Sequence, residues 1–466
     1  MVEQLVQDAL KNPTVENLLR ALLALAEAYM KLEQENERLR RILNNNSANS
    51  SQPPSKDQKP SKSPNQYNSR EKSGKRKGGQ EGHAGKTVTK EQVQKLVKEG
   101  KAVHRIVDVG EPRGKFVPKY VLDTKTQVVV TEFRFYPDAS GKIAIPPEHR
   151  SDVTYGPDVK ALCALLFSEG VVSNDRIHMI LTSISGNVLP ISTGTIYNIC
   201  KAAAKRAEPS VEASTSALCA SAVVCTDATG VTVGGRQAFI RNYSTADVCL
   251  YEYHSSKSLA SLRKSAVLPN YTGVLEHDHE TALYRFGGGH GECNAHLLRY
   301  LTKNSEETRN PWSDKLKEFL CAANRLRDTH MAAQEGSLSE EELACLYGKY
   351  DSIVAMGEQQ NKTTKGYRAW KEESALLRRL RKYKENHLLF LKDFRVPFTN
   401  NMSERDLRKC KNRQKMAGGF REDEGCNMYC MILSFVETAK RRGQNLLSAL
   451  RSLFETPLTA DYLASV

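Results

Sequence analysis

Three acidic residues in the sequence could act together as metal ligands. Asp227 follows an apolar run and precedes a glycine in AVVCTDATG, and Asp278 ends the apolar run in TGVLEHD. Glu404 opens the basic segment SERDLRKCKNRQK. Taken singly, each Asp is more readily explained as a turn or cap residue. Glu404 alone is explained as a first-turn partner of the helix dipole.

The spacing of these acids suggests that they meet. Alternation along a strand puts Asp227 on the same face as Cys225, and Asp278 on the same face as Glu276. If the two strands lie side by side, their carboxylates meet at one edge of a sheet. Glu404, delivered from a helix, would add a third carboxylate, and Asn400 or Asn401 would cap that helix.

Clustered carboxylates repel one another unless a cation lies among them. Mg²⁺ or Mn²⁺ is the expected occupant, because both prefer hard oxygen ligands and keep positions open for water and phosphate. Two such ions about 4 Å apart stabilise the entering and leaving oxygens of an in-line phosphoryl displacement. Cationic residues that follow Glu404 would then hold a DNA backbone; these are Arg405, Arg408, Lys411, Arg413 and Lys415.

Overall composition agrees with a polyanionic partner. The chain has 466 residues, a formal net charge of +14 and a pI near 9.1, which favours nucleic acid. No stretch approaches 18 apolar residues, so no membrane span is expected. The N-terminus lacks the pattern of a signal peptide, and the eleven cysteines contain no CxxC pair. The expected location is therefore the reducing cytoplasm, at the nucleoid.

The N-terminal part divides into a helix and a tether. Residues 1–45 are predicted to form a coiled-coil helix, because residues 15–43 repeat apolar side chains at heptad spacing with Asn36 in the seam. A homodimer or higher oligomer would form through this segment; the alternative is an amphipathic helix packed on its own domain. Residues 46–90 are a disordered basic linker rich in Ser, Pro, Gly and Lys. Within it, Lys75, Arg76 and Lys77 are expected to contact phosphates, the alternative being a solubilising linker.

The rest of the chain is expected to form three further units. Residues 91–150 alternate in short runs and predict a small β unit. Residues 151–215 are helical and form either a DNA-reading helix-turn-helix or a helical scaffold. Residues 216–455 show strand-like runs and then helices, which predicts a mixed α/β domain with a helical insertion at about 296–395. The glycine run at 286–291 is interpreted as a flexible loop.

The order of TDATG, LEHDHE, GECNAHLLRY and TNNMSERDLRK along the chain resembles the DDE transposases of the insertion sequence 66 family. The resemblance implies an N-terminal leucine zipper, a basic linker, a zinc-finger-like module and an RNase H-like core. It assigns Asp227, Asp278 and Glu404 as catalytic and metal-binding residues. Cys293 and His296 match the CxxH signature of that family.

The roles of Cys293 and His296 are expected to be structural or DNA-positioning. A zinc site is the alternative, but two ligands without a second pair nearby argue against it. The chain also departs from the family pattern in two places. Residues 90–150 hold no cysteine, so the zinc-finger-like module is degenerate and lacks metal, and Ala228 stands where relatives often have Glu.

The resemblance implies a transposase that cleaves the ends of its element with Mg²⁺ or Mn²⁺ and transfers the 3′-OH strand into target DNA. Its partners would be the terminal repeats, the target DNA and accessory proteins of the same element. Two other functions stay open at this point. One is a catalytically inactive DNA-binding dimer, and the other is an RNase H-like nuclease without strand transfer.

Overall fold

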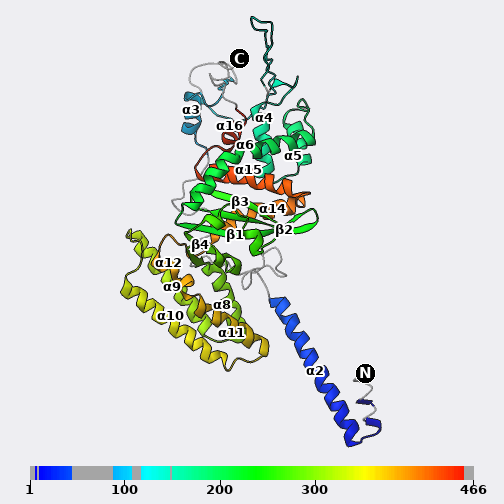
Figure 1. The fold of residues 1–466 in the computed structure, drawn as a ribbon, viewed down its shortest axis with the longest axis vertical. Coiled ribbons are helices and arrows are strands. Elements are labelled where there is room, and N and C mark those ends of the chain that lie inside the picture. The colour runs from blue at the N-terminus through cyan, green and yellow to red at the C-terminus, as the bar shows by residue number, and fades with distance from the viewer. Residues whose placement is uncertain (1–5, 8–9, 45–87, 108–116, 147–148, 456–466) are drawn as a thin grey trace.

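The computed structural model describes residues 6–7, 10–44, 88–107, 117–146 and 149–455 (Figure 1). Its centre is one five-stranded sheet in the order β3-β2-β1-β4-β5. The strands are β1 (Val223–Val233), β2 (Arg236–Ser244), β3 (Cys249–His254), β4 (Val274–His277) and β5 (Gly289–Glu292). β1, β2 and β3 pair antiparallel, whereas β4 runs parallel to both β1 and β5. The mixed α/β class predicted for this region is therefore correct.

Local sequence explains the strand pairing. β1 and β2 are joined by Gly234 and Gly235, both at positive φ (55° and 73°), as a two-residue hairpin turn requires. The glycine run at 286–291 is not the flexible loop that the sequence suggested, because it leads into β5. A Cβ on Gly291 would lie 2.1 Å from Oε2 of Glu276 on β4. Glycine is required there for the two strands to approach.

Helices lie at both ends of the sheet. The helices that precede the sheet in the chain are α2 (Val15–Asn44), α3 (Lys90–Lys98), α4 (Pro157–Ser168), α5 (Asn174–Ile184) and α6 (Thr193–Cys219). Within and after the sheet come α7 (Leu259–Leu262), α8 (Asn294–Thr308), α9 (Trp312–Ala332), α10 (Glu340–Asn361), α11 (Tyr367–Lys382), α12 (Lys384–Lys392), α13 (Asn401–Asp406), α14 (Arg408–Ala417), α15 (Asp423–Arg441) and α16 (Leu446–Ser452). Across the described ranges, none of these helices combines the length and apolar character that crossing a membrane needs.

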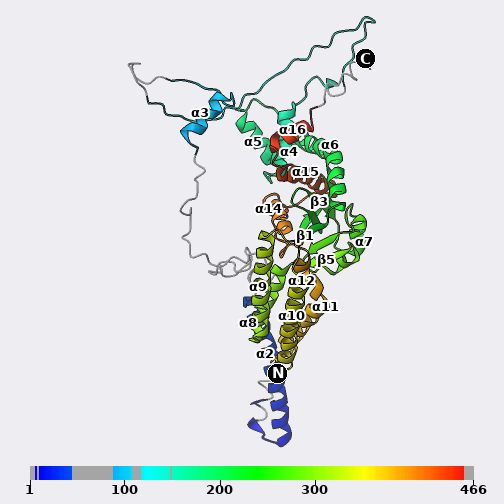
Figure 2. The ribbon, with the colours of Figure 1, turned by 90° about the vertical axis from the view of Figure 1, so that its left-hand side faces the viewer.

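Two groups of helices cover different parts of the sheet. In both views α4, α5, α6, α15 and α16 gather on the β3 side, and α8 to α12 form a bundle on the β4–β5 side (Figures 1 and 2). The first group shares one apolar core with β1, β2 and β3. The bundle has its own core and occupies the stretch of about 296–395 that the sequence predicts to be helical.

The bundle is centred on a buried, fully bonded carboxylate. Glu373 on α11 is 0 % exposed. It accepts hydrogen bonds from Trp312 Nε1 (2.7 Å), Asn310 Nδ2 (2.8 Å), Asn361 Nδ2 (2.9 Å) and Thr364 Oγ1 (2.5 Å). Because a buried charge is tolerated only when it is well bonded, this contact set fixes how α9, α10 and α11 pack.

The predicted small β unit at 91–150 is not found. In the described parts of this stretch, 91–107, 117–146 and 149–150, the chain forms α3 and no strand. Its apolar side chains lie in solvent, with Val121 93 % and Val130 90 % exposed. Alternation predicts a strand only where one face is buried, and here neither face is covered. The apolar–polar pattern was therefore misleading.

The helical region at 151–215 is packed into the core of the protein. Ile177 of α5, Ile196 of α6 and Phe167 of α4 are buried in the core shared with α15. Eight residues (185–192) join α5 to α6 and five (169–173) join α4 to α5. Both connections exceed the turn of about three or four residues of a helix-turn-helix. The scaffold alternative fits this geometry better.

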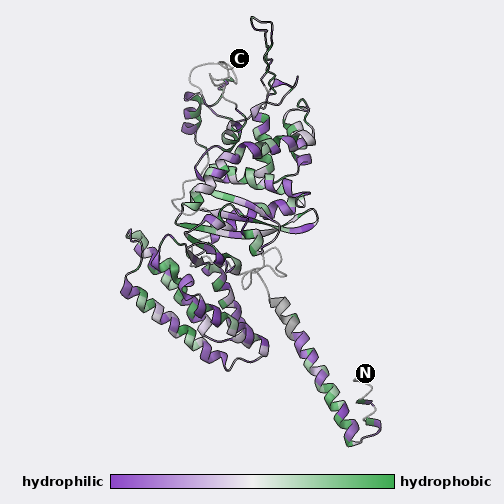
Figure 3. Cartoon of the chain, in the orientation of Figure 1, coloured by the Kyte–Doolittle hydropathy of each residue, from purple (hydrophilic) through white to green (hydrophobic). Residues whose placement is uncertain are grey.

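Helix α2 occupies the predicted coiled-coil stretch, and its seam faces solvent. Leu18, Leu25, Leu32 and Leu39 are between 46 % and 62 % exposed. Figure 3 shows hydrophobic and hydrophilic residues interleaved along this helix. Association through the seam therefore stays a prediction. Residues 45–87, which include most of the predicted basic linker with Lys75, Arg76 and Lys77, lie outside the described residues.

Candidate active site

The parallel pairing of β1 and β4 aligns the two aspartates. Val223 pairs with Val274 and Cys225 with Glu276, so partners in this ladder are 51 positions apart in the chain. Asp227 and Asp278 have the same separation. Asp227 is the fifth residue of the eleven-residue strand β1, not its end as the sequence suggested, and Asp278 directly follows β4. Continued two residues beyond its last pair, this register brings Asp227 and Asp278 to neighbouring positions beside the sheet.

The electrostatics of Asp227 show that the two acids are close. Burial and the negative charge of Asp278 raise the pKa of Asp227 to about 7. The N–H of Ala228, which donates to Asp227 Oδ1 at 2.7 Å, opposes that shift, as do the charges of Lys257 and Arg241. A carboxyl with so high a pKa would be stabilised in its charged form by a bound cation.

Glu404 reaches the site from a short helix that is fastened to β1. Asn400, just before α13, donates through Nδ2 to the carbonyl oxygen of Thr226 at 2.8 Å and through its backbone N–H to Cys293 Sγ at 3.1 Å. The backbone N–H of Glu404 in turn donates to the Asn400 carbonyl oxygen at 3.2 Å. Asn400 occupies the N-cap position of α13, as one of the two expected candidates, but its side chain makes no cap bond to the helix. Its amide instead holds α13 against the strand that carries Asp227.

A buried aspartate secures the other end of α13. Asp406 is 7 % exposed and accepts from Ser244 Oγ (2.7 Å) and from Arg441 Nη2 (2.5 Å). Asn242 on β2 also donates to it at 3.4 Å, and its Oδ1 accepts the backbone N–H of Asp227 at 3.2 Å. Sequence inspection missed Asn242 and Asp406 because their partners come from distant strands and helices.

His296 lies close to Glu404 and within range of the charge of Asp278. Its Nδ1 is 3.7 Å from Glu404 Oε1. Burial and the nearby Arg299 lower the pKa of His296, whereas the negative charges of Glu404 and Asp278 oppose that change. The charges of both acids therefore act on the pKa of His296. Within the described part of the chain, one group of three or more Cys, His or acidic residues has its donor atoms within 4.8 Å of one another. This group consists of Cys293, His296 and Glu404, and it does not include Asp227 or Asp278.

The acidic site fits a hard divalent cation. Burial and the nearby negative charge of Asp278 both disfavour the charged form of Asp227. The Oε1 atom of Glu404 is buried without a hydrogen-bond partner. Carboxylate oxygens are the ligands that Mg²⁺ and Mn²⁺ prefer. Asp227 and Asp278 would hold such an ion from the strand side, and Glu404 from the helix side.

A second polar network, which the sequence did not reveal, supports the loop after Asp278. His279 has a positive φ of 69° and lies 2.9 Å, through Nδ1, from Glu292 Oε1. Glu292 on β5 also accepts from Tyr284 and, at 2.6 Å, from Arg379 Nη2 on α11. This network fixes the backbone next to Asp278 and links it to the helical bundle.

The basic residues after Glu404 divide into exposed and buried groups. Arg405, Arg408, Lys411 and Lys415 are exposed. Arg413 is 6 % exposed, donates to the carbonyl oxygen of Phe167 at 3.1 Å and lies over the rings of Phe167, Phe420 and Tyr429. We therefore correct its expected role as a DNA contact, because its guanidinium is enclosed and already bonded.

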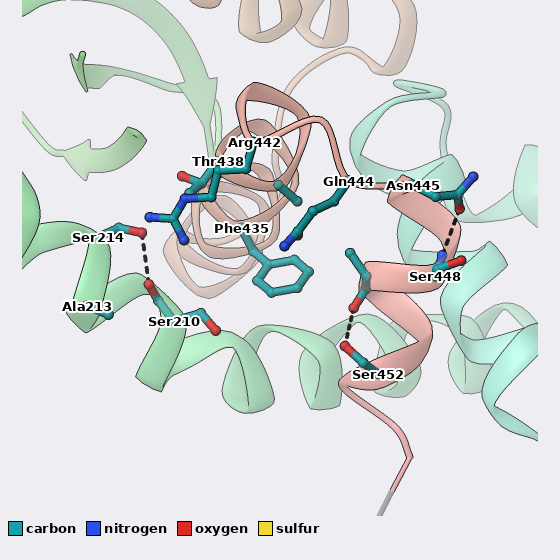
Figure 4. A pocket seen from close by; sticks show the side chains of 12 residues that line it. Ser210, Ala213, Ser214, Phe435, Thr438, Arg442, Gln444, Asn445, Ser448 and Ser452 are labelled. Atoms are coloured by element: carbon teal, nitrogen blue, oxygen red, sulfur yellow. Dashed lines mark hydrogen bonds between the residues drawn. The ribbon is translucent and has the colours of Figure 1, made fainter. Parts of the chain in front are cut away.

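A separate pocket lies away from these acids. It measures about 530 Å³, lies between α6, α15 and α16, and is lined by polar side chains that include Ser214, Thr438 and Arg442 (Figure 4). No acidic residue lines it. We place the candidate active site at the acids instead, because that is where strand register, burial and charge converge.

The arrangement defines an α/β protein in which a mixed sheet holds two aspartates close to each other and Glu404 opens a basic helical segment. Comparison with protein families agrees with that class: the Transposase IS66 family model matches residues 154–428, more than half of the chain. The chain belongs to this transposase family. Residues 4–89 match a family of unknown function, DUF6444. Comparison with curated proteins found no match.

Proposed function

We propose that this transposase cleaves the ends of its element and transfers the resulting 3′-OH strand into target DNA, with Asp227, Asp278 and Glu404 as its catalytic acids. The register that aligns Asp227 with Asp278 is the observation that carries the proposal. The sheet order, with three antiparallel strands followed by two parallel ones, supports an RNase H-like core. DNA is the partner that membership of the family implies.

Two divalent ions, Mg²⁺ or Mn²⁺, would activate the attacking oxygen and stabilise the leaving oxygen of the phosphodiester. The protein contributes the carboxylates and their placement. Asp227 on β1 and Asp278, directly after β4, would hold the ions from the sheet, and Glu404 would hold them from a helix fixed by Asn400 and Asp406. A strand-based site of this kind keeps its geometry better than one built on loops.

The exposed cations of α13 and α14 provide the DNA-binding surface of the proposal. Arg405 and Arg408 are one turn apart, and Lys411 and Lys415 continue along α14. Phosphate contacts of this kind position a duplex without reading its sequence. The terminal repeats and target DNA would lie across this surface, and α2 would hold two copies of the chain together.

The test is a cleavage and joining assay with DNA that carries the inverted repeats of the element. Wild-type protein with Mg²⁺ should cut at the repeat ends and join them to a target plasmid. Asp227→Asn, Asp278→Asn and Glu404→Gln should each lower the cleavage rate by at least about 10²-fold, the effect of removing a group that stabilises the transition state. Asp247→Asn, an exposed acid on the β2–β3 turn, is the matched control.

The outcomes separate the proposal from its alternatives. Normal cleavage by Asp227→Asn would overturn the assignment of the acids. Cutting without joining would identify a nuclease instead. DNA binding by wild-type protein without cleavage in either metal would identify an inactive DNA-binding protein.

A further inference from the structure

Three donor atoms of different chemistry meet beside the acidic site. Cys293 Sγ, a ring nitrogen of His296 and a carboxylate oxygen of Glu404 all lie within 4.8 Å of one another. Cys293 is the N-cap of α8 and His296 is in its first turn, so their side chains share one face of that helix. Glu404 comes from α13, which packs alongside. The proposed reaction uses the carboxylate but gives no role to the sulfur.

The cluster contains polar atoms that lack partners. Nδ1 of His296 and Oε1 of Glu404 are both buried and have no hydrogen-bond partner among the described residues. The exposed fractions of the two side chains are 11 % and 23 %. Buried polar atoms of native proteins are nearly always bonded, so two in one cluster call for a ligand. Cys293 Sγ accepts the backbone N–H of Asn400 at 3.1 Å, which leaves sulfur lone pairs for another bond.

The donor types select a particular class of metal. Sulfur and imidazole nitrogen are poor ligands for Mg²⁺ but good ligands for Zn²⁺ and its neighbours. A site with three protein ligands and one open position is typical of zinc enzymes. Two bonds of about 2 Å at a tetrahedral angle place their donor atoms about 3.3 Å apart, so the 3.7 Å between His296 Nδ1 and Glu404 Oε1 needs only a small closure. Cys293 and His296 have no second pair of ligands nearby in the sequence, but the fold brings Glu404 to them as a third donor.

We propose that Cys293, His296 and Glu404 form a binding site for a soft divalent transition metal such as Zn²⁺, and that its occupancy withdraws Glu404 from the acidic site. Binding forms a metal–sulfur bond and releases the thiol proton of Cys293 to solvent, with no change of oxidation state. The binding site stands on the cluster geometry. Its inhibitory consequence rests on the proposed function, in which Glu404 holds a catalytic ion.

Cobalt(II) titration of the full-length, metal-free protein tests the site directly. Co²⁺ bound by a thiolate gives a charge-transfer absorption band in the near ultraviolet, which reports the Cys293 bond without any need for DNA cleavage. Wild-type protein should show a saturable band that added Zn²⁺ removes. Cys293→Ser should lose it, while its hydroxyl can still accept the N–H of Asn400. His296→Gln should weaken Co²⁺ binding by at least about tenfold, since even losing a hydrogen-bond partner of a metal ligand costs about 10–100-fold.

The controls separate this site from the other cysteines. Cys345 on α10 is exposed and belongs to a different part of the fold, so Cys345→Ser should leave the band unchanged. A wild-type protein without the band, or an equal band in Cys293→Ser, would overturn the site. If Cys293→Ser does not fold, unchanged Co²⁺ affinity in His296→Gln overturns it instead.

A second assay separates the inhibitory consequence from the site. At fixed Mg²⁺, added Zn²⁺ should inhibit cleavage, and a higher Mg²⁺ concentration should restore it. Co²⁺ and Zn²⁺ binding without inhibition would overturn the consequence but not the site. Absence of cleavage by wild-type protein in Mg²⁺ alone would count against the proposed function and leave the spectroscopic result standing.

Discussion

The side-chain amide of Asn400 donates to the carbonyl oxygen of Thr226 at 2.8 Å, across 174 positions of the chain. Thr226 directly precedes Asp227, and Asn400 precedes the helix that carries Glu404. One hydrogen bond therefore spans the two halves of the candidate site. Both residues are buried, at 0 % and 1 % exposure, so water cannot replace the bond if it is lost.

Replacing Asn400 should uncouple the two halves. Asn400→Ala leaves the Thr226 carbonyl unsatisfied in the interior, which should lower the free energy of unfolding by about 1–3 kcal/mol. Cleavage should fall further than stability explains, because Glu404 loses its fixed position. Thermal unfolding and cleavage rates measured over a range of Mg²⁺ concentrations check this, and a higher Mg²⁺ requirement is expected. Asn401→Ala, an exposed neighbour, should change neither; equal effects of both variants would contradict the prediction.

The raised pKa of Asp227 predicts a pH-dependent stability in metal-free protein. The pKa is about 7 in the folded state and 3.8 for an ordinary Asp, so the folded state binds the proton more tightly. Stability should therefore fall as pH rises from about 4 to about 7, by at most about 4 kcal/mol. Asp227→Asn should remove this fall, and added Mg²⁺ should reduce it. Urea unfolding in EDTA at several pH values measures the effect.

The control for this titration is Asp247→Asn, which should keep the wild-type pH profile. Identical profiles for wild-type protein and Asp227→Asn would show that Asp227 does not titrate near neutrality. That result would exclude a raised pKa of Asp227 caused by the charge of Asp278.

Glu292 should be important for both stability and cleavage. Burial alone would raise its pKa, but the bonds and charges of His279, His387 and Arg379 lower the pKa below the ordinary value. Its contribution to stability is therefore present above the ordinary Glu pKa and is lost as pH falls below it. At neutral pH Glu292→Gln should cost about 3–5 kcal/mol, as is usual when one partner of a buried pair is removed.

The matched control is the exposed pair of Glu358 and Arg381, whose Nη2–Oε2 distance is also 2.6 Å. Glu358→Gln should cost no more than about 1 kcal/mol, because water screens exposed pairs. The two losses are compared by denaturant unfolding at pH 7. A Glu292→Gln variant as stable as Glu358→Gln would show that the network does not support the loop after Asp278.

Arg413 and Arg408 should differ in how their loss affects DNA binding. Arg408 is exposed, so Arg408→Ala should weaken binding and reduce the slope of log affinity against log salt by about 1. Arg413→Ala should lower the melting temperature and leave that slope unchanged, because its guanidinium packs among aromatic rings. Fluorescence anisotropy at several salt concentrations measures both. If Arg413→Ala reduced the salt slope without lowering stability, Arg413 would be a DNA contact after all.

Sequence patterns predicted the parts of the fold that depend on local order. The three antiparallel strands and the helical bundle follow from hydrophobic periodicity, and the aspartates were recognised because each follows an apolar run. β5 was missed because a glycine-rich strand lacks the β-branched residues that mark strands. The sequence predicts strands in 117–146 that the structure lacks. Alternation of apolar and polar residues shows that one face could be buried, but not that another element covers it.

The acids of the candidate site could be predicted from the sequence, whereas the residues that position them could not. A carboxylate in a basic segment, such as Glu404, can be recognised from the sequence alone. The roles of Asn242, Asp406 and Glu292 depend on partners that only folding brings near. Arg413 shows the reverse error: a cation in a basic run was assigned to the surface, although its neighbours in space are Phe167, Phe420 and Tyr429.

Helix α2 should hold copies of the chain together through its exposed seam. Leu25 and Leu32 are 55 % and 62 % exposed in the single chain, and burying such side chains in a partner gains about 1.5–3 kcal/mol each. Leu25→Glu/Leu32→Glu should therefore convert the oligomer to a monomer in sedimentation or light-scattering measurements. Lys31→Glu, outside the seam, changes the net charge of the chain by the same two units and should leave the oligomer intact. A wild-type monomer at micromolar concentration would instead favour a helix that packs within its own chain.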